Sequence, residues 1–347
     1  MIAALISFLL GLAAQDLPFV RHDLGEAPYE LRGAALDGSR LVAWGGALIE
    51  WKLPAGRPRV LARGDFQEGG CLADLDGDGR LEFVGQEGAG LGSLTWRKAP
   101  NWKPERIDSN VDMHDCIEAT LLGRTGLLMV HRYGQVRFYE RPAKPAERWP
   151  YREIYSFYTD SRQGGLLPHD VDGDGFTDII SGNYWIRSPK SFDLPWRLFA
   201  INTDHTTPDA ATSRFALLDD GRLAVSQGHR WNGKLSIFVR PSDPTQLWME
   251  HRLNPDRTLA KPHGLDTADL DGDGDRDLLV AENAGEAARI FIVWQEGRVR
   301  FRAVRLHAGE PIHTLKAADL NGDGKPDVIA VGARTVTWWE NRYPFRK

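Results

Sequence analysis

The sequence contains little cysteine and no excess of positive charge. Its 347 residues include two cysteines, Cys71 and Cys116, which are too few for the disulfide scaffold of a small secreted domain. The 43 Lys and Arg residues are outnumbered by 48 Asp and Glu residues, and the net charge is −5. No basic stripe of the kind found in DNA- and RNA-binding proteins is present, so we expect no nucleic-acid partner.

Long hydrophobic runs are absent after residue 14. Residues 1–14, MIAALISFLLGLAA, have the apolar core and small-residue end of a secretory signal peptide, although the usual basic residues at the start are missing. The run is too short to span a bilayer, and the alternative interpretation is a buried N-terminal strand or helix. We favour a signal peptide cleaved near Ala14. The mature protein, residues 15–347, is then expected to be secreted to the periplasm or the extracellular space and to have no membrane span.

Sustained helical periodicity is also missing. Short runs of aromatic and β-branched residues are separated by Gly, Pro and Asp, and the chain contains 36 Gly and 12 Trp residues. This composition is typical of β-strands joined by turns. The sequence therefore predicts an all-β protein, and its length suits two average domains or one large all-β domain.

One acidic segment, DLDGDGDRD at residues 269–277, has the pattern of a calcium-binding loop. Alternate residues of a tight loop can direct their carboxylates to one centre, and the backbone carbonyl of Asp275 at position seven would add another oxygen ligand. An EF-hand is excluded because position twelve is Val280, within an apolar run typical of a strand, where an EF-hand has a bidentate Glu. The carboxylates at positions one, three, five and nine belong to Asp269, Asp271, Asp273 and Asp277.

The same loop occurs three more times. An acidic turn that binds nothing is the alternative interpretation, but clustered carboxylates repel one another unless a cation lies between them. We therefore expect up to four Ca²⁺ ions, which would raise the net charge from −5 to +3. The further ligand positions are Asp74, Asp76, Asp78, Arg80 and Glu82; Asp170, Asp172, Asp174, Phe176 and Asp178; and Asp319, Asn321, Asp323, Lys325 and Asp327, where Arg80, Phe176 and Lys325 contribute the position-seven carbonyl.

The glycine at the fourth position of each loop marks an internal repeat. These glycines and three degenerate copies define seven repeats with a period of roughly 50 residues. The sixth repeat contains four strand-like runs, at residues 265–270, 277–281, 289–294 and 300–306. Radial repetition of such units predicts a seven-bladed β-propeller of four-stranded antiparallel blades, in a single domain over residues 15–347. The repeat glycines are Gly38, Gly77, Gly123, Gly173, Gly221, Gly272 and Gly322.

The seventh repeat contains three strand-like runs, at residues 313–320, 327–331 and 335–341, and no fourth. Residues 19–26 resemble the last strand of the sixth repeat. We therefore expect the N-terminal strand to complete the last blade.

The two cysteines fall on the first strands of adjacent repeats. Their distances from the repeat glycine differ by one residue, which directs the two side chains to opposite faces of their sheets. We therefore favour two buried thiols over a disulfide bond.

The four acidic loops and the repeat period resemble the FG-GAP and VCBS repeats known from integrin α-subunit propellers and from many secreted bacterial proteins. The resemblance covers nearly the whole mature chain and implies a calcium-binding β-propeller. It does not imply a single function, because such propellers serve both adhesion and catalysis. The repeats at Gly38, Gly123 and Gly221 lack the acidic residues, so no calcium is expected there.

The start of each first strand and the connection between second and third strands are expected at the end of the ring opposite the calcium loops. Polar and aromatic groups that converge on a concave surface predict a ligand site, in which Trp and Tyr suit sugar rings and Arg and His suit acidic groups. Each residue also has a structural interpretation, as a hydrogen-bond partner or in packing between blades. Nine residues before the repeat glycines lie Tyr29, Glu68, His114, Gly164, Thr212, His263 and His313.

We expect the ligand to be a glycan or an extracellular protein. The protein itself is expected to be a monomer. The alternative is a polysaccharide lyase or sugar dehydratase, in which a cation neutralises a uronate while a base and an acid transfer protons. A structural surface protein is a third interpretation. The histidines at this end of the ring, which we call the channel mouth, could instead hold a transition metal. The residues expected to bind the ligand are His114, His263, His313, Tyr184, Trp185, Trp231, Glu282 and Asn283, and those proposed for lyase chemistry are His131, Arg132, Tyr133, His229 and Arg230.

Overall fold

The computed structural model describes residues 17–143, 148–159, 161–204, 213–228, 233–253, 259–285, 287–298 and 300–345. The expected signal peptide, residues 1–14, lies outside the described residues, as do His229, Arg230 and Trp231. Within these ranges, no helix is long and apolar enough to cross a membrane.

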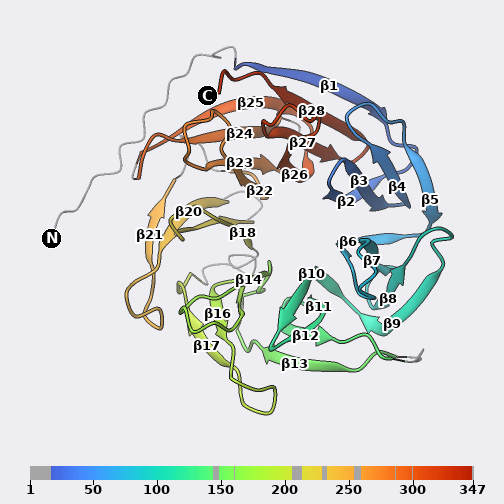
Figure 1. Ribbon diagram of the computed structural model, residues 1–347, viewed down its shortest axis with the longest axis vertical. Helices are drawn as coiled ribbons and strands as arrows, with labels where there is room; N and C mark the ends of the chain where they lie inside the picture. The colour runs from blue at the N-terminus through green and yellow to red at the C-terminus, as the bar shows by residue number, and fades with distance from the viewer. Residues whose placement is uncertain are drawn as a thin grey trace.

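Seven four-stranded antiparallel sheets surround a central axis as the blades of a propeller (Figure 1). Blades 1 to 6 each consist of four consecutive strands, the first of which lies innermost. Blade 1 contains β2 (Leu31–Asp37), β3 (Arg40–Gly45), β4 (Ala47–Lys52) and β5 (Arg59–Arg63), and blade 2 contains β6 (Phe66–Ala73), β7 (Glu82–Glu87), β8 (Gly92–Arg97) and β9 (Pro104–Val111). Blade 3 contains β10 (Met113–Leu121), β11 (Arg124–His131), β12 (Gln135–Tyr139) and β13 (Tyr151–Ser156).

The remaining blades continue around the ring. Blade 4 contains β14 (Leu167–His169), β15 (Asp178–Ser181), β16 (Tyr184–Arg187) and β17 (Arg197–Ala200), and blade 5 contains β18 (Ser213–Leu217), β19 (Leu223–Gln227), β20 (Lys234–Val239) and β21 (Met249–Arg252). Blade 6 contains β22 (Pro262–Ala268), β23 (Asp277–Glu282), β24 (Ala288–Gln295) and β25 (Phe301–Gly309). Blade 7 contains β26 (Ile312–Ala318), β27 (Asp327–Gly332) and β28 (Thr335–Asn341), and its fourth strand is β1 (Phe19–Glu26).

The ring is closed by the N-terminal strand. Strand β1 pairs antiparallel with β28 and lies on the outer edge of blade 7, with Phe19 opposite Asn341 and His22 opposite Trp338 (Figure 1). The rings of His22 and Trp338 also stack, with centroids 4.4 Å apart. The predicted fold, including completion of the last blade by the N-terminal strand, is confirmed.

The hydrophobic core of the described residues lies between the blades. It divides into seven clusters, one at each interface between neighbouring blades. Because both faces of a blade are covered, the central strands are apolar without alternation; every residue of β23 and of β27 is buried. This double burial explains why the acidic residue that begins each of these strands, Asp277 or Asp327, is buried as well.

Cys71 and Cys116 form a disulfide bond, so the expectation of two free thiols is wrong. Their side chains do point to opposite faces of their own sheets. However, adjacent blades pack face to face, so the rear face of one blade meets the front face of the next. Opposite directions therefore bring Cys71 of β6 and Cys116 of β10 together in the apolar layer between blades 2 and 3.

We predict that loss of this disulfide destabilises the fold. It closes a loop with a sequence separation of 45 residues, and the chain-entropy model assigns about 4 kcal/mol of unfolding free energy to a loop of that size. Urea unfolding of the oxidised protein, the reduced protein and a Cys71→Ala/Cys116→Ala variant measures this difference. The reduced protein and the variant should share a lower midpoint; equal midpoints for all three samples would contradict the prediction.

Candidate functional site

The acidic loops share one hydrogen-bond geometry. In blade 6 the carboxylate of Asp269 accepts the N–H groups of Gly272 at 2.8 Å and Gly274 at 3.1 Å, and both glycines have positive φ, +76° and +95°. A positive φ at these two positions strongly favours glycine. The carboxylate of Asp273 accepts the N–H of Asp275 at 2.9 Å. The same contacts recur in the loops that begin at Asp74, Asp170 and Asp319.

The carboxylate at the ninth position links each loop to its blade. In blade 6 the two oxygens of Asp277 accept the N–H groups of Leu270 at 3.0 Å and Gln295 at 2.9 Å. Burial, opposed by these hydrogen bonds and reinforced by the negative charge of Asp271 and Asp273, raises the pKa of Asp277 to about 8. Burial likewise raises the pKa of Asp178 to about 7, of Glu82 to about 7 and of Asp327 to about 6.

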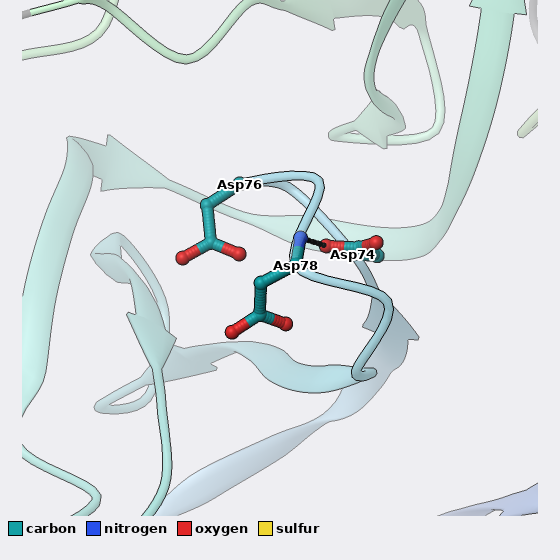
Figure 2. A group of neighbouring side chains, drawn as sticks. All are labelled: Asp74, Asp76 and Asp78. Atoms are coloured by element: carbon teal, nitrogen blue, oxygen red, sulfur yellow. Dashed lines mark hydrogen bonds between the residues drawn. The ribbon is translucent and has the colours of Figure 1, made fainter.

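Three of the loops bring carboxylate oxygens close enough to hold one ion. The oxygens of each group lie within 4.8 Å of one another, and Figure 2 shows the carboxylates of Asp76 and Asp78 extending in parallel from one loop. The Oδ1 atom of Asp76 is buried and has no hydrogen-bond partner among the described residues. A hard cation with oxygen ligands, such as Ca²⁺, fits this donor set. The groups are Asp74, Asp76 and Asp78; Asp170, Asp172 and Asp178; and Asp269, Asp271 and Asp273.

Three of the four acidic loops are already in contact with a cationic side chain. In blade 2, Lys98 contacts Asp76, and its Nζ atom lies 2.6 Å from Oδ2 of Asp78. In blade 4, Nε of Arg187 lies 2.6 Å from Oδ2 of Asp172. In blade 7, Nζ of Lys325 lies 3.8 Å from Oδ2 of Asp323. No such ion pair is formed by Asp269, Asp271 and Asp273 within the described ranges. The loop of blade 6 is therefore the one whose charge neighbouring side chains compensate least.

The histidines predicted at the channel mouth lie at β-bulges in the innermost strands. The register between β10 and β11 shifts at His114, and equivalent shifts occur at His263 in β22 and at His313 in β26. Glu68 falls within a longer irregularity of β6. Side chains of a regular inner strand point alternately toward the two neighbouring blades, whereas a bulge re-aims a side chain. The bulges therefore account for the placement of these groups in the channel.

One cavity of about 370 Å³ occupies the channel, and we call it the channel cavity. It is lined by charged and histidine side chains from the inner strands of six blades, and by Trp44. This convergence fits a site for a polar or charged ligand. The charged and histidine residues are Arg32, Glu68, His114, Asp115, Arg214, His263, His313 and Lys316.

An ion-pair network crosses the channel cavity. Nδ1 of His263 lies 3.1 Å from the carbonyl oxygen of His313, which can only accept, so Nδ1 carries a proton. Nε2 of His263 lies 2.6 Å from Oε1 of Glu68 and 2.8 Å from Nη2 of Arg214. The carboxylate contact of His263 is the shorter of these two, and Arg214 also pairs with Asp115 at 3.1 Å.

The electrostatics of the cavity separate its charged groups from its neutral ones. Burial acts to raise the pKa of Glu68, but its hydrogen bond to His263 and the positive charges of Lys261 and Arg214 hold that pKa well below its usual range. Burial lowers the pKa of His114 to about 3, assisted by the positive charge of Arg214. Burial and the neighbouring His263 also lower the pKa of His313. Glu68 is therefore ionised at neutral pH, whereas His114 and His313 are neutral.

Several residues expected at the mouth have structural contacts elsewhere. Trp185 is fully buried between blades 4 and 5, where its Nε1–H donates to the carbonyl of Pro244 and its ring stacks on Phe199. Tyr184 stacks on Phe157. Glu282 is buried and pairs with Arg289. These three residues do not line the channel cavity.

Asn283 and the described residues proposed for lyase chemistry, His131, Arg132 and Tyr133, do not line the channel cavity. Asn283 donates to the carbonyl of Ile312 and lies 3.2 Å from Nδ1 of His313, which it orients. His131 is buried, its Nδ1 accepts the N–H of Asp112, and Arg132 is in the adjoining turn. Tyr133 packs against the ring of His114.

Four charged residues of the channel cavity were not predicted from the sequence: Arg32, Asp115, Arg214 and Lys316. Arg32 occupies the bulge of β2, in the position that His263 has in β22. The hairpin of blade 1 has a two-residue turn, in which the repeat glycine comes first rather than fourth, so counting back nine residues reached Tyr29 instead of Arg32. Aligning the ends of the inner strands would have found it.

The fold is a β-propeller, and four of its hairpin loops are acidic turns whose oxygen atoms suit a hard cation. Residues 269–330 match the FG-GAP-like repeat family. This match and the seven-bladed ring fit an FG-GAP repeat β-propeller, the architecture that the sequence resemblance predicted. No curated protein matches the sequence.

Solved structures resemble the whole chain. BBS1N, solved in complex with ARL6DN, superposes with a TM-score of 0.61 and 10% identity over 95% of this chain and 99% of that one. XC5397, a gluconolactonase from Xanthomonas campestris, has a TM-score of 0.46 and 15% identity over 94% of this chain and 91% of that one. At such low identity the first likeness shows the fold alone, and the second is too weak in shape to support an argument.

We predict that His114 makes stability depend on pH. Because the folded-state pKa of His114 is about 3 and the unfolded value is about 6.5, only the unfolded chain binds this proton between those values. The stability present above pH ~6.5 is thus lost as the pH falls toward ~3, with a slope of up to about 1.4 kcal/mol per pH unit. Urea unfolding between pH 4 and 7 should show a shallower slope for His114→Gln than for wild type. Parallel curves would contradict a buried neutral histidine.

Proposed function

We propose that this protein is a secreted, calcium-stabilised β-propeller that binds an acidic glycan in the channel cavity. The observation that carries the proposal is the set of bulges that direct polar side chains from separate blades into one cavity. The volume of about 370 Å³ lies in the range of small-molecule sites, roughly 300–1,000 Å³. Secretion is supported by the apolar residues 1–14 and by the disulfide, a bond typical of oxidising compartments.

The lining of the cavity favours recognition by charge and hydrogen bonds over stacking on sugar rings. Arg32 and Arg214 have the planar, forked donor geometry that suits a carboxylate. The neutral imidazoles of His114 and His313 can each donate to or accept from a hydroxyl. Trp44 is the tryptophan that contributes to the described lining, and it is largely buried. A sugar bearing a carboxylate, such as a uronic acid, matches this set of groups.

A lyase acting on an acidic polysaccharide is the second candidate function. It is favoured by the contact between Tyr133 and the neutral His114, with the guanidinium of Arg162 5.4 Å from the centre of the Tyr133 ring. A phenol and an imidazole in contact supply an acid and a base, and the nearby guanidinium supplies positive charge for a uronate. Unsaturated products released from an acidic polysaccharide would distinguish this activity from binding alone.

Calcium removal should destabilise the protein. At ~1 mM calcium and a Kd of ~0.1 mM, each occupied loop contributes about 1.4 kcal/mol. Four loops would then approach the total stability of a typical domain, about 5–15 kcal/mol. Thermal unfolding with calcium and with excess EDTA should therefore differ sharply, and equal melting temperatures would exclude the structural role.

The loop of blade 6 offers a matched pair of variants for the same measurement. Asp271→Asn removes a proposed ligand and should lower the bound calcium by one ion per chain. Asp219→Asn, at an exposed residue that pairs with Arg276, should leave the calcium content unchanged.

Removal of Arg214 should weaken binding of acidic glycans. Loss of a hydrogen bond to a charged group typically weakens binding about tenfold or more. An array of acidic and neutral glycans, followed by titration of the strongest binder, compares the wild type with Arg214→Gln. The control is Arg197→Gln, at an exposed position of the outer strand β17. Equal affinity for acidic and neutral glycans, or an unchanged affinity in Arg214→Gln, would exclude the channel cavity as the site.

A further inference from the structure

A second cavity, of about 430 Å³, lies where blade 5 meets blades 4 and 6. Its lining includes Asp170 and Gly173 from the acidic loop of blade 4, and Asp220 and Gly221 from the β18–β19 turn. We call it the hairpin-end cavity, because both turns join the first and second strands of their blades. It shares no lining residue with the channel cavity.

One wall of the hairpin-end cavity is apolar. Strands β20, β21 and β25 contribute Ile237, Val239, Met249 and Phe301. Phe301 is buried, whereas Met249 is 56% exposed although its side chain is apolar. An exposed methionine at the rim of an apolar wall offers a flexible, polarizable contact surface for a hydrocarbon group.

Two of the arginines that line this cavity form no ion pair with any residue that the structure describes. Arg222 is fully engaged: its Nε binds Asp220 at 2.7 Å, and its Nη1 donates to the carbonyl of Arg298 at 2.6 Å. Asp170 accepts the backbone N–H groups of its own loop. Arg240 and the guanidinium of Arg298, by contrast, form no ion pair within the described part of the chain, although both line the cavity.

We propose that the hairpin-end cavity binds a small organic monoanion, a carboxylate that bears an aromatic ring or a short hydrocarbon chain. The carboxylate faces Arg240 and Arg298, and the hydrocarbon part packs on Val239, Met249 and Phe301. Guanidinium groups match the planar geometry of a carboxylate. Arg222 and Asp220 compensate each other, which leaves Arg240 and Arg298 to hold the carboxylate of the ligand.

Binding of 2-naphthoate, followed by its fluorescence anisotropy in calcium-containing buffer, tests the proposal. We expect saturable binding of 2-naphthoate. Two competitors at equal concentration should fail to displace it: 2-naphthalenemethanol, which lacks the charge, and acetate, which lacks the aromatic ring. Arg240→Gln and Arg298→Gln should each weaken binding about tenfold. Arg57→Gln, at an exposed position between β4 and β5, is the matched control and should bind as the wild type does.

A substitution in the apolar wall tests the contact with the hydrocarbon part of the proposed ligand separately from the contact with its carboxylate. Met249→Glu places a negative charge at an exposed rim position, so the fold should persist while 2-naphthoate binding falls at least tenfold. Circular dichroism and urea midpoints verify that each variant is folded. Absence of saturable binding, equal displacement by the uncharged counterpart, or unchanged affinity in both arginine variants would overturn the proposal.

Discussion

No blade of this protein can bury its two faces by itself. Every described cluster of the core lies between two blades, and central strands such as β23 and β27 are buried on both sides. A linear stack of such sheets would expose an apolar face at each end. This exposure would be unfavourable, because the hydrophobic effect scales with the apolar area left in water. Closure of the ring by β1 and β28 removes both ends at once. The order of the blades, the axial channel and the positions of the two cavities all depend on this closure.

The ring geometry also explains why the residues that face the axis differ from those that pack between the blades. Side chains at regular positions of an inner strand point alternately toward the two neighbouring blades. A bulge can re-aim a side chain toward the axis. The bulges at His114, His263 and His313 provide such side chains without removing apolar contacts from the core. The histidines at the axis are thus supplied by single-residue insertions in the inner strands.

The sequence predicts the parts of this structure that repeat. The acidic loops, the spacing of the repeat glycines and the apolar central strands recur, so they indicate seven blades and their closure by residues 19–26. The mouth histidines were found for the same reason, because they share an offset from the loops. Arg32 was missed because the turn of blade 1 is shorter, and Arg214 and Asp115 because no repeated position marks them. Cation binding by the loops and ligand binding in the channel remain predictions.

Contacts between blades were harder to predict than strands within them. Trp185 and Tyr184 have the composition of a sugar-binding surface but pack inside the protein, because whether an aromatic ring faces solvent or a neighbouring blade depends on tertiary structure. The cysteines illustrate the same limitation. Their opposite orientations seemed to exclude a bond as long as each sheet was considered alone, and only the packing of blade 2 on blade 3 reverses that conclusion.

The disulfide between β6 and β10 makes the seams of the ring unequal. Six interfaces are held by non-covalent packing, and one is fastened covalently near the axis. Any transient widening of the propeller must therefore begin at an interface without a disulfide, and blades 2 and 3 then move together as one unit. Glu68 and His114, which precede the two cysteines on the same strands, travel within that unit. Breathing of the ring would then change the distance from Glu68 to His263 while the spacing between Glu68 and His114 stayed nearly fixed.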